Sequence, residues 1–298
     1  MVNAIKAALK RLSQFATVAA VSFFAWQPAA LADPALWVLR DEDSTIYLFG
    51  TIHVMKPGVK WHSDKLDAAF ASSSELWVEE TGDDNQTMMY QLVKTYGVDP
   101  HHPITAKLTP AQQARFVKVS QVLGLDPAAV DRTRPWLAAA MLGGAAVART
   151  GFISEKGIDR SLEADAKAAG KPIKSFETPE QQIHVFADLK PEEELAMLTQ
   201  TLDEVGKGPT YLMLIATSWL HGDIEQLDKQ LSANMRGQTP ALYKAILPDR
   251  NARWVKRIEE MMVGKGTAFI AVGTAHLIGQ DSVIAMLAKD GYKAERVQ

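Results

Sequence analysis

Two copies of one short motif stand out because each combines a glycine with a histidine three residues later. Residues 50–53 read G-T-I-H and residues 273–276 read G-T-A-H, and each copy directly follows an apolar run typical of a buried strand. Glycine permits a sharp exit from a strand, so His53 and His276 could each turn back over the carboxyl edge of a sheet. Ligands bind at that edge in open parallel sheets. The matched pair therefore indicates one shared site.

Carboxylates follow two further apolar runs. Residues 76–78 lead into Glu79 and Glu80, and residues 172–176 lead into Glu177. If these strands run parallel to the strands before the two G-T-x-H motifs, two histidines and two glutamates meet at one edge of the sheet. Neutral imidazoles and carboxylates together form a ligand set for Zn, Mn, Fe or Co. A carboxylate that is not a ligand could act as the general base toward a metal-bound water.

Simpler interpretations of these residues stay open at this point. A histidine after a strand is commonly a hydrogen-bonded loop residue, and Glu79 and Glu80 could be solvated charges at a strand end. Glu177 could owe its place to the dipole of the helix that follows it. Because Glu79 and Glu80 are adjacent in a strand, they point to opposite faces, and only one of them can face the histidines. Spacing alone does not select between them.

The elements that would position these side chains alternate between strand and helix at both ends of the chain. The N-terminal end predicts a strand at 45–49, a helix at 63–72 and a strand at 76–79. A strand–helix–strand order is typical of a parallel pair. The C-terminal end repeats this layout, with a strand, a helix and a strand expected at 268–272, 281–289 and 292–297.

The middle of the chain is mostly helical by its pattern. Capping boxes at 109–112 and 178–181 predict two helix starts. Residues 127–150 predict one long helix with a kink at Pro135. Further helices are expected to begin at or near Ile158, Pro191, Tyr211, Asp223 and Asp249.

These elements predict an α/β fold in a single domain spanning residues 33–298. Its centre would be a mixed, largely parallel sheet with flanking helices. A large helical insertion, at about 85–247, lies in sequence between the two halves of the carboxyl edge. We therefore expect the insertion to lie beside the site and to cover the substrate.

The first 32 residues have the layout of a secretory signal peptide. Positive charges lie at Lys6, Lys10 and Arg11, and a twelve-residue apolar stretch follows at 15–26. Residues 30–32 read A-L-A, so cleavage is expected after Ala32. An uncleaved amphipathic anchor is the alternative. No later apolar run reaches about 18 residues, so we expect a periplasmic or secreted protein with no stable membrane insertion after cleavage.

Composition excludes several classes of function. The chain has 298 residues, a net charge of −3 and no basic stripe, which argues against a nucleic acid as partner. It has no cysteine, so disulfides, zinc fingers, iron–sulfur clusters and cysteine nucleophiles are excluded. The G-x-S-x-G, P-loop and H-E-x-x-H motifs are absent as well.

The two G-T-x-H motifs resemble those of the TraB/GumN family, which is related to the Tiki metalloproteases. The resemblance covers residues 36–297, nearly the whole chain after the predicted cleavage point. Glu79, in L-W-V-E, matches the family's strand-end glutamate, so the resemblance selects it over Glu80. Asp249 stands where the family's E-R-N block usually has glutamate. The other matching segments are 157–173, 176–181, 219–223, 247–251 and 271–277.

This resemblance implies roles for particular residues. Tiki-like members are similar to divalent-metal proteases that use both G-x-x-H histidines and the glutamate. By resemblance, His53, His276 and Glu79 form the metal site, with Glu79 either a ligand or the general base. Arg250 would stabilise the substrate or an intermediate. Glu177 is a further catalytic candidate from its place at the end of a strand.

We therefore expect an exported metal-dependent hydrolase that acts on a peptide or protein substrate with Mn, Co or Zn. A metal-free, esterase-like hydrolase, in which histidine and glutamate alone activate water, is one alternative. The other is a non-enzymatic protein that binds a ligand or haem through the histidine pair. Both alternatives have relatives in the wider superfamily, which includes erythromycin-esterase-like hydrolases and haem-binding proteins.

Overall fold

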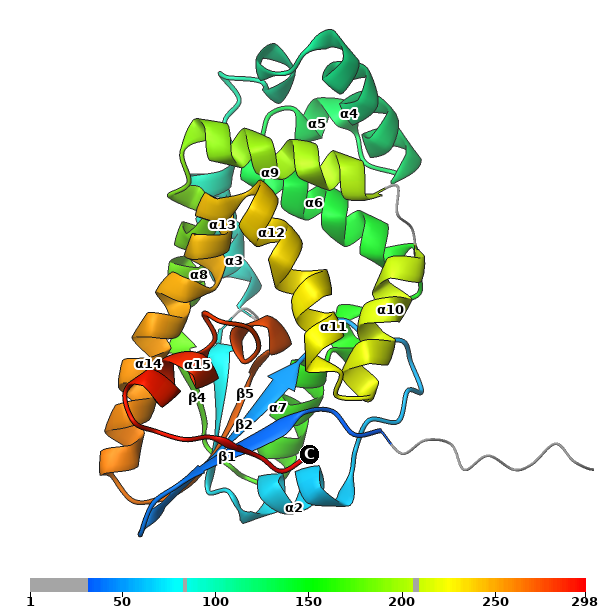
Figure 1. The fold of residues 1–298 in the computed structure, drawn as a ribbon. Coiled ribbons are helices and arrows are strands. Elements are labelled where there is room, and N and C mark those ends of the chain that lie inside the picture. The colour runs from blue at the N-terminus through cyan, green and yellow to red at the C-terminus, as the bar shows by residue number, and fades with distance from the viewer. Residues whose placement is uncertain (1–31, 83–84, 206–208) are drawn as a thin grey trace, which may run out of the picture. The chain divides into compact units, whose positions relative to one another are not determined.

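A six-stranded mixed sheet carries the elements of the site, in the order β4-β3-β5-β2-β1-β6 (Figure 1). In this computed structural model, which describes residues 32–82, 85–205 and 209–298, β4, β3, β5 and β2 pair in parallel, and β1 pairs antiparallel with both β2 and β6. The sheet with its flanking helices confirms the predicted α/β class. The strands are β1 Leu36–Arg40, β2 Ser44–Thr51, β3 Glu75–Glu80, β4 Ile173–Glu177, β5 Gly266–Gly273 and β6 Glu295–Arg296.

The predicted signal peptide falls on residues outside the described part of the chain, apart from Ala32. Among the residues that the structure describes, no helix combines the length and the apolar character needed to cross a bilayer. Export therefore stays a prediction from the sequence.

Strand β5 lies between β2 and β3, although it is the farthest of the three along the chain. We expected the strands at 45–49 and 76–79 to form a parallel pair. They are parallel, but each pairs with β5 instead of with the other. The physical reason is burial: six consecutive residues of β5 are buried, and such a strand is stabilised at the centre of a sheet with both faces covered.

The antiparallel edge differs from the sequence prediction in two ways. Strand β1 was not predicted, although its apolar run is buried and pairs with β2. The strand expected at 292–297 is reduced to Glu295–Arg296, which pairs with β1. Strand β6, at the edge, is held by one neighbour and carries little signal of its own, whereas β1 is held by both β2 and β6.

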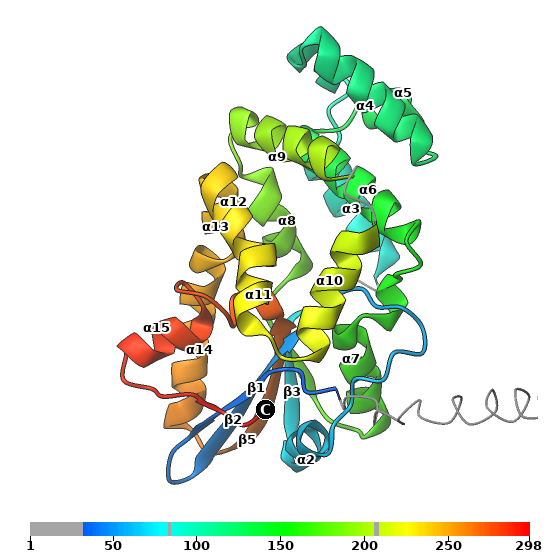
Figure 2. The same ribbon diagram turned by 45° about the vertical axis from the view of Figure 1, so that its right-hand side comes forward.

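Helices cover both faces of the sheet (Figure 2). Helices α14 (Pro248–Val263) and α15 (Val283–Lys289) lie on one side, and α2 (Asp64–Ser72) and α7 (Ile158–Ala168) lie on the other. Helix α14 buries residues four apart, including Trp254, Ile258 and Met262, so it presents one apolar stripe to the sheet. This packing fixes the start of α14 beside the carboxyl ends of the strands.

The remaining helices gather beyond the carboxyl ends of the parallel strands (Figure 1). Most of the predicted insertion is found there, but α7 and β4, which also belong to it, are part of the layers of the sheet. The helices are α3 Gln86–Gly97, α4 Pro110–Val122, α5 Pro127–Val130, α6 Pro135–Ala148, α8 Pro179–Ala187, α9 Pro191–Glu204, α10 Pro209–Leu220, α11 Ile224–Asp228, α12 Asn234–Gln238 and α13 Pro240–Ile246.

Local signals within this helical part differ in how well they predict the structure. Both capping boxes form, with Thr109 on α4 and Thr178 on α8 as the N-cap residues. The prediction of one long, kinked helix at 127–150 is wrong, because this segment forms two separate helices, α5 and α6. Arg134 has extended backbone and Pro135 opens α6, because the residue before a proline avoids the helical conformation.

Candidate active site

The carboxyl ends of four parallel strands bring the predicted residues to one edge of the sheet. His53 follows the end of β2, and His276 lies in the 3₁₀ turn Thr274–His276 after β5. Glu79 and Glu177 lie at the ends of β3 and β4. The edge-of-sheet arrangement inferred from the sequence is therefore present.

Glu79 lies between the two histidines. Its Oε1 atom is 3.9 Å from Nε2 of His53 and 3.8 Å from Nε2 of His276. The backbone N–H of Gly273 donates to the same oxygen at 2.7 Å. The neighbouring Glu80 lines a cavity together with Glu79 and His53, but it does not line the cavity that His276 lines. The structure thus places Glu79, and not Glu80, between the histidines.

The glycines of the two motifs are required by close approach. A Cβ atom on Gly273 would lie 3.0 Å from Glu79 Oε1 and 3.2 Å from His53 Nε2. A Cβ atom on Gly50 would lie 2.8 Å from Thr274 Oγ1. Neither glycine has a positive φ, so the exit of the chain from each strand does not use the left-handed conformation that glycine permits. The two motifs instead pack against each other, and side chains at these positions would separate them.

Each histidine is oriented by a partner on its other ring nitrogen. Nδ1 of His53 is 3.3 Å from Oδ2 of Asp159, and Nδ1 of His276 is 2.5 Å from Oδ1 of Asn251. These contacts direct both Nε2 atoms toward Glu79, the arrangement by which outer partners orient metal-binding histidines. Sequence reasoning did not assign roles to Asp159 and Asn251. Both lie in segments that resemble family motifs, which was the available signal.

Arg250 connects the carboxylates to His276. Its Nη2 donates to Glu79 Oε2 at 2.6 Å and to Glu177 Oε2 at 2.7 Å, while Nη1 donates to His276 Nε2 at 3.1 Å. The guanidinium is buried and lies 4.8 Å from the centre of the Trp254 ring. One fixed positive charge therefore holds three of the predicted site residues together.

The two histidines have opposite electrostatic surroundings. Burial, with the nearby charges of Arg250 and His53, lowers the pKa of His276 to about 3 despite the charge of Glu79. Desolvation also acts on His53, but the hydrogen bond to Asp159 and the charges of Glu79 and Asp159 outweigh it and raise the pKa to about 9. The metal-free protein therefore carries a neutral His276 and a charged His53 at neutral pH.

Glu79 is a carboxylate at neutral pH. Burial alone would raise its pKa, but the positive charges of Arg250 and His53, together with the Gly273 N–H, lower the pKa to about 2. A buried anion of this kind is suited to holding a cation.

Glu177 is bound on both oxygens by arginines. Arg250 donates to it through Nε and Nη2, and Nη2 of Arg253 donates to Oε1 at 3.0 Å. Because these donors use its acceptor capacity, the geometry suits Glu177 to positioning Arg250. Its predicted catalytic role stays a prediction.

A cleft of about 450 Å³ opens onto the site. His53, Glu79, Arg250 and His276 form its polar floor. Its walls come largely from the helical insertion, so that part of the chain does lie beside the site. The insertion contributes Gln182, Val185, Phe186, Leu212, Ile215, Leu231, Ile246 and Leu247.

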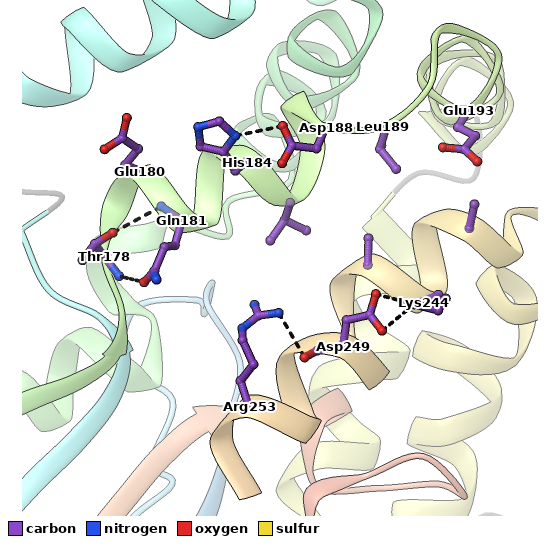
Figure 3. Close-up of a pocket in the computed structure, with 13 residues that line it drawn as sticks. Thr178, Glu180, Gln181, His184, Asp188, Leu189, Glu193, Lys244, Asp249 and Arg253 are labelled. Atoms are coloured by element: carbon purple, nitrogen blue, oxygen red, sulfur yellow. Dashed lines mark hydrogen bonds and ion pairs between the residues drawn. The ribbon is translucent and has the colours of Figure 1, made fainter. Parts of the chain in front are cut away.

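A larger polar cavity, of about 760 Å³, is lined by residues of α8, α13 and α14 (Figure 3). None of the five predicted site residues lines it. Its charges pair locally: His184 with Asp188 at 2.8 Å, and Lys244 with Asp249 at 2.6 Å. Arg253 is its link to the site, through Glu177. The histidines, Glu79 and Arg250 line the cleft of about 450 Å³ instead, so that cleft is the candidate active site.

The residues of the cleft fit a divalent metal by type. Two imidazole Nε2 atoms and one carboxylate oxygen are suitable donors. Within residues 32–82, 85–205 and 209–298, however, no three His, Asp or Glu side chains are placed so that they could hold a metal as they stand. Arg250 donates to the Nε2 lone pair of His276, so a metal on that atom would replace this hydrogen bond. His53 would also have to lose its proton.

Comparisons with known proteins agree with the motifs of the site. The chain is 23% identical over 267 residues to an uncharacterized protein of Treponema pallidum (strain Nichols), an alignment that covers 85% of this chain and 80% of the relative. No solved structure matches the chain significantly. Residues 35–296, which include every predicted site residue, match the TraB/PrgY/gumN family. The chain therefore belongs to the TraB/PrgY/gumN family.

Proposed function

We propose that this protein is an exported hydrolase of peptides or proteins that works with a divalent metal, Mn, Co or Zn, held by His53, His276 and Glu79. One observation carries the proposal. The Nε2 atoms of two histidines, each oriented through Nδ1, approach the same oxygen of Glu79 at 3.9 and 3.8 Å. Export rests on the signal-peptide pattern of residues 1–32.

A bound metal would supply Lewis-acid polarisation and activation of water at this place. The chain's own groups have separate tasks. Glu79, with a pKa of about 2, is a weak proton acceptor and a good ligand, which supports the ligand role over the role of base. Arg250, held in position by Glu177, directs a fixed positive charge at the floor of the cleft. Such a group stabilises negative charge that develops on a substrate carbonyl.

A metal-free hydrolase is the second candidate, and the contact of Arg250 with His276 favours it. The Nε2 lone pair of His276 is already used by a protein donor. His53, with Asp159 behind it, would then act as a general acid, because its pKa of about 9 keeps it protonated at neutral pH. The two candidates differ in whether activity depends on metal.

The test measures metal content and peptide cleavage on the same preparations of the full chain processed at its signal peptide. Protein is loaded with Mn, Co or Zn, analysed by elemental mass spectrometry and assayed against a peptide library with and without chelator. We expect one metal per chain, cleavage that the chelator removes, and loss of both in His53→Ala and His276→Ala. His102→Ala is the matched control, because His102 also pairs through Nδ1 with an aspartate, Asp99, and lies outside the cleft.

Other outcomes assign the alternatives. Cleavage that is unaffected by chelator and by metal content would favour the metal-free hydrolase. Full metal content in both histidine variants would contradict the paired-ligand proposal. A Soret absorption band on the purified protein, without cleavage, would indicate the haem-binding alternative.

A further inference from the structure

Two cavities meet at the candidate active site. The cleft of about 450 Å³ and a second cavity of about 300 Å³ have four lining residues in common, Thr51, His53, Glu79 and Gln182. The shared residues include one histidine and the glutamate between the histidines. A bond that reacts at this place would therefore have one cavity on each side of it.

The cleft, which is the larger of these two cavities, has an apolar wall. Val54 comes from the loop after β2, Phe186 from α8, Leu212 and Ile215 from α10, and Leu231 from the segment after α11. These side chains surround the polar floor described above. A wall of this kind stabilises a large apolar side chain by removing it from water.

The smaller cavity has a charged wall instead. Glu80, Asp159 and Glu163 line it together with Arg160. Nη1 of Arg160 is 3.4 Å from Glu163 Oε2. Burial raises the pKa of Glu163, since the charge of Arg160 does not compensate fully for its desolvation. The four carboxylates that line this cavity, including Glu79, outnumber its two basic side chains, Arg160 and His53, so it favours a positively charged guest.

Buried oxygens provide a second, independent indication of such a guest. Thr51 is 1% exposed, and its Oγ1 has no hydrogen-bond partner among the described residues although the side chain lines the cavity. Oδ1 of Asp159 is likewise buried without a partner, while Oδ2 contacts His53. Buried acceptors without donors are costly, and an ammonium or guanidinium group carries several N–H donors.

We propose that the two cavities bind the two sides of one scissile peptide bond, an apolar side chain in the larger cavity and a lysine or arginine side chain in the smaller one. This inference rests on the proposed hydrolase function and names its substrate class. It requires the bond to lie beside His53 and Glu79, the residues that both cavities share. Peptides with an apolar and a basic residue across the bond, in a single order along the chain, are the preferred substrates.

The experiment compares the metal-loaded wild-type chain with Glu163→Lys and Glu163→Gln. The substrates are peptides that vary at the two positions across the scissile bond, with lysine or glutamine opposite leucine or serine. We expect the ratio of kcat/KM for lysine over glutamine peptides to fall at least about tenfold in Glu163→Lys and less in Glu163→Gln. Leu212→Asn should reduce the preference for leucine over serine instead. Glu192→Lys, an exposed charge change outside both cavities, is the control.

A binding measurement keeps this inference separate from the hydrolase proposal. N-acetyl-Leu-Lys-amide and N-acetyl-Lys-Leu-amide, each beside the compound with glutamine in place of lysine, are titrated by NMR into the full chain without metal. Tighter binding of the lysine compound than of its glutamine counterpart in one of the two orders, lost in Glu163→Lys, supports the inference even if no peptide is cleaved. Equal binding of lysine and glutamine compounds in both orders, or cleavage without preference for a basic residue, overturns it. Absence of cleavage with every metal would contradict only the hydrolase proposal.

Discussion

The two G-T-x-H turns are nearly identical in sequence, yet their histidines lie in opposite surroundings. The side chain of His53 is 60% exposed, and its partner is the carboxylate Asp159. The side chain of His276 is only 4% exposed, with the amide of Asn251 as its partner. The ring of His276 also lies 4.3 Å from that of Trp254. A repeated motif has therefore produced one charged and one neutral imidazole.

This difference shows that the motif determines the position of the histidine, while the neighbouring residues determine its protonation state. An aspartate stabilises the imidazolium form of His53. Burial and a nearby arginine favour neutral His276. His276 thus accepts an N–H of Arg250 at neutral pH and needs no loss of a proton before it binds a metal, whereas His53 must first release a proton.

The largest expected effect comes from the group that both turns share. Glu79→Gln should lower hydrolysis by about 10²–10⁴-fold, because it removes the anion between the two histidines. Glu75→Gln, in the same strand but outside the site, should have little effect. Metal content after Glu79→Gln then separates its roles: lost metal indicates a ligand and retained metal indicates a base. Full activity of Glu79→Gln would contradict the assignment of Glu79 to the active site.

Arg250 is what makes the surroundings of His276 unlike those of His53. Arg250→Ala leaves Glu79 and Glu177 buried without their shared cation, so the free energy of unfolding should fall by about 3–5 kcal/mol. Arg253, 55% exposed, also donates to Glu177, but Arg253→Ala should cost no more than about 1 kcal/mol. Urea denaturation of both variants measures the difference. If both variants lost the same free energy of unfolding, the burial of Arg250 would not explain its contribution to stability.

The partners on Nδ1 test the comparison of the two histidines directly. Asn251→Ala leaves the buried Nδ1–H of His276 without an acceptor and should destabilise the protein by about 1–3 kcal/mol. Asp159→Ala should cost about 1 kcal/mol or less, because water can reach the exposed His53. Each variant should weaken metal binding by about 10–100-fold. If Asp159→Ala were more destabilising than Asn251→Ala, burial of the histidine would not be what decides the cost of losing its partner.

The pH dependence of stability should have opposite signs for the two histidines in the metal-free protein. The pKa of His53 is raised from 6.5 to about 9, so its contribution to stability is complete below pH 6.5 and is lost as the pH rises toward 9. The pKa of His276 is lowered to about 3, so its contribution is complete above pH 6.5 and is lost as the pH falls toward 3.

The matching variants sharpen this comparison. His53→Ala should flatten the decline in stability on the alkaline side, and His276→Ala should flatten it on the acid side. Urea denaturation across this pH range, with wild type in parallel, measures both slopes. If both variants changed the pH dependence of stability on the same side, the opposite pKa shifts of His53 and His276 would be contradicted.

The sequence alone determined much of the site because its signals are local. Apolar runs that end in G-T-x-H placed His53 and His276 at strand ends, and the capping boxes placed two helix starts. The family motifs selected Glu79 over Glu80. Each of these signals is carried by a few consecutive residues, so it can be identified without knowledge of distant parts of the chain.

The tertiary structure decided which distant residues meet. Strand β5 lies between β2 and β3 because a strand with a long buried apolar run is stabilised at the centre of the sheet, and no local pattern encodes that order. Asp159 reaches His53 from a position 106 residues away, and Arg250 binds Glu79 from 171 residues away. Burial and charge at such contacts set the two imidazoles apart. Both depend on the packed structure because desolvation and Coulomb interactions act through space, independently of separation along the chain.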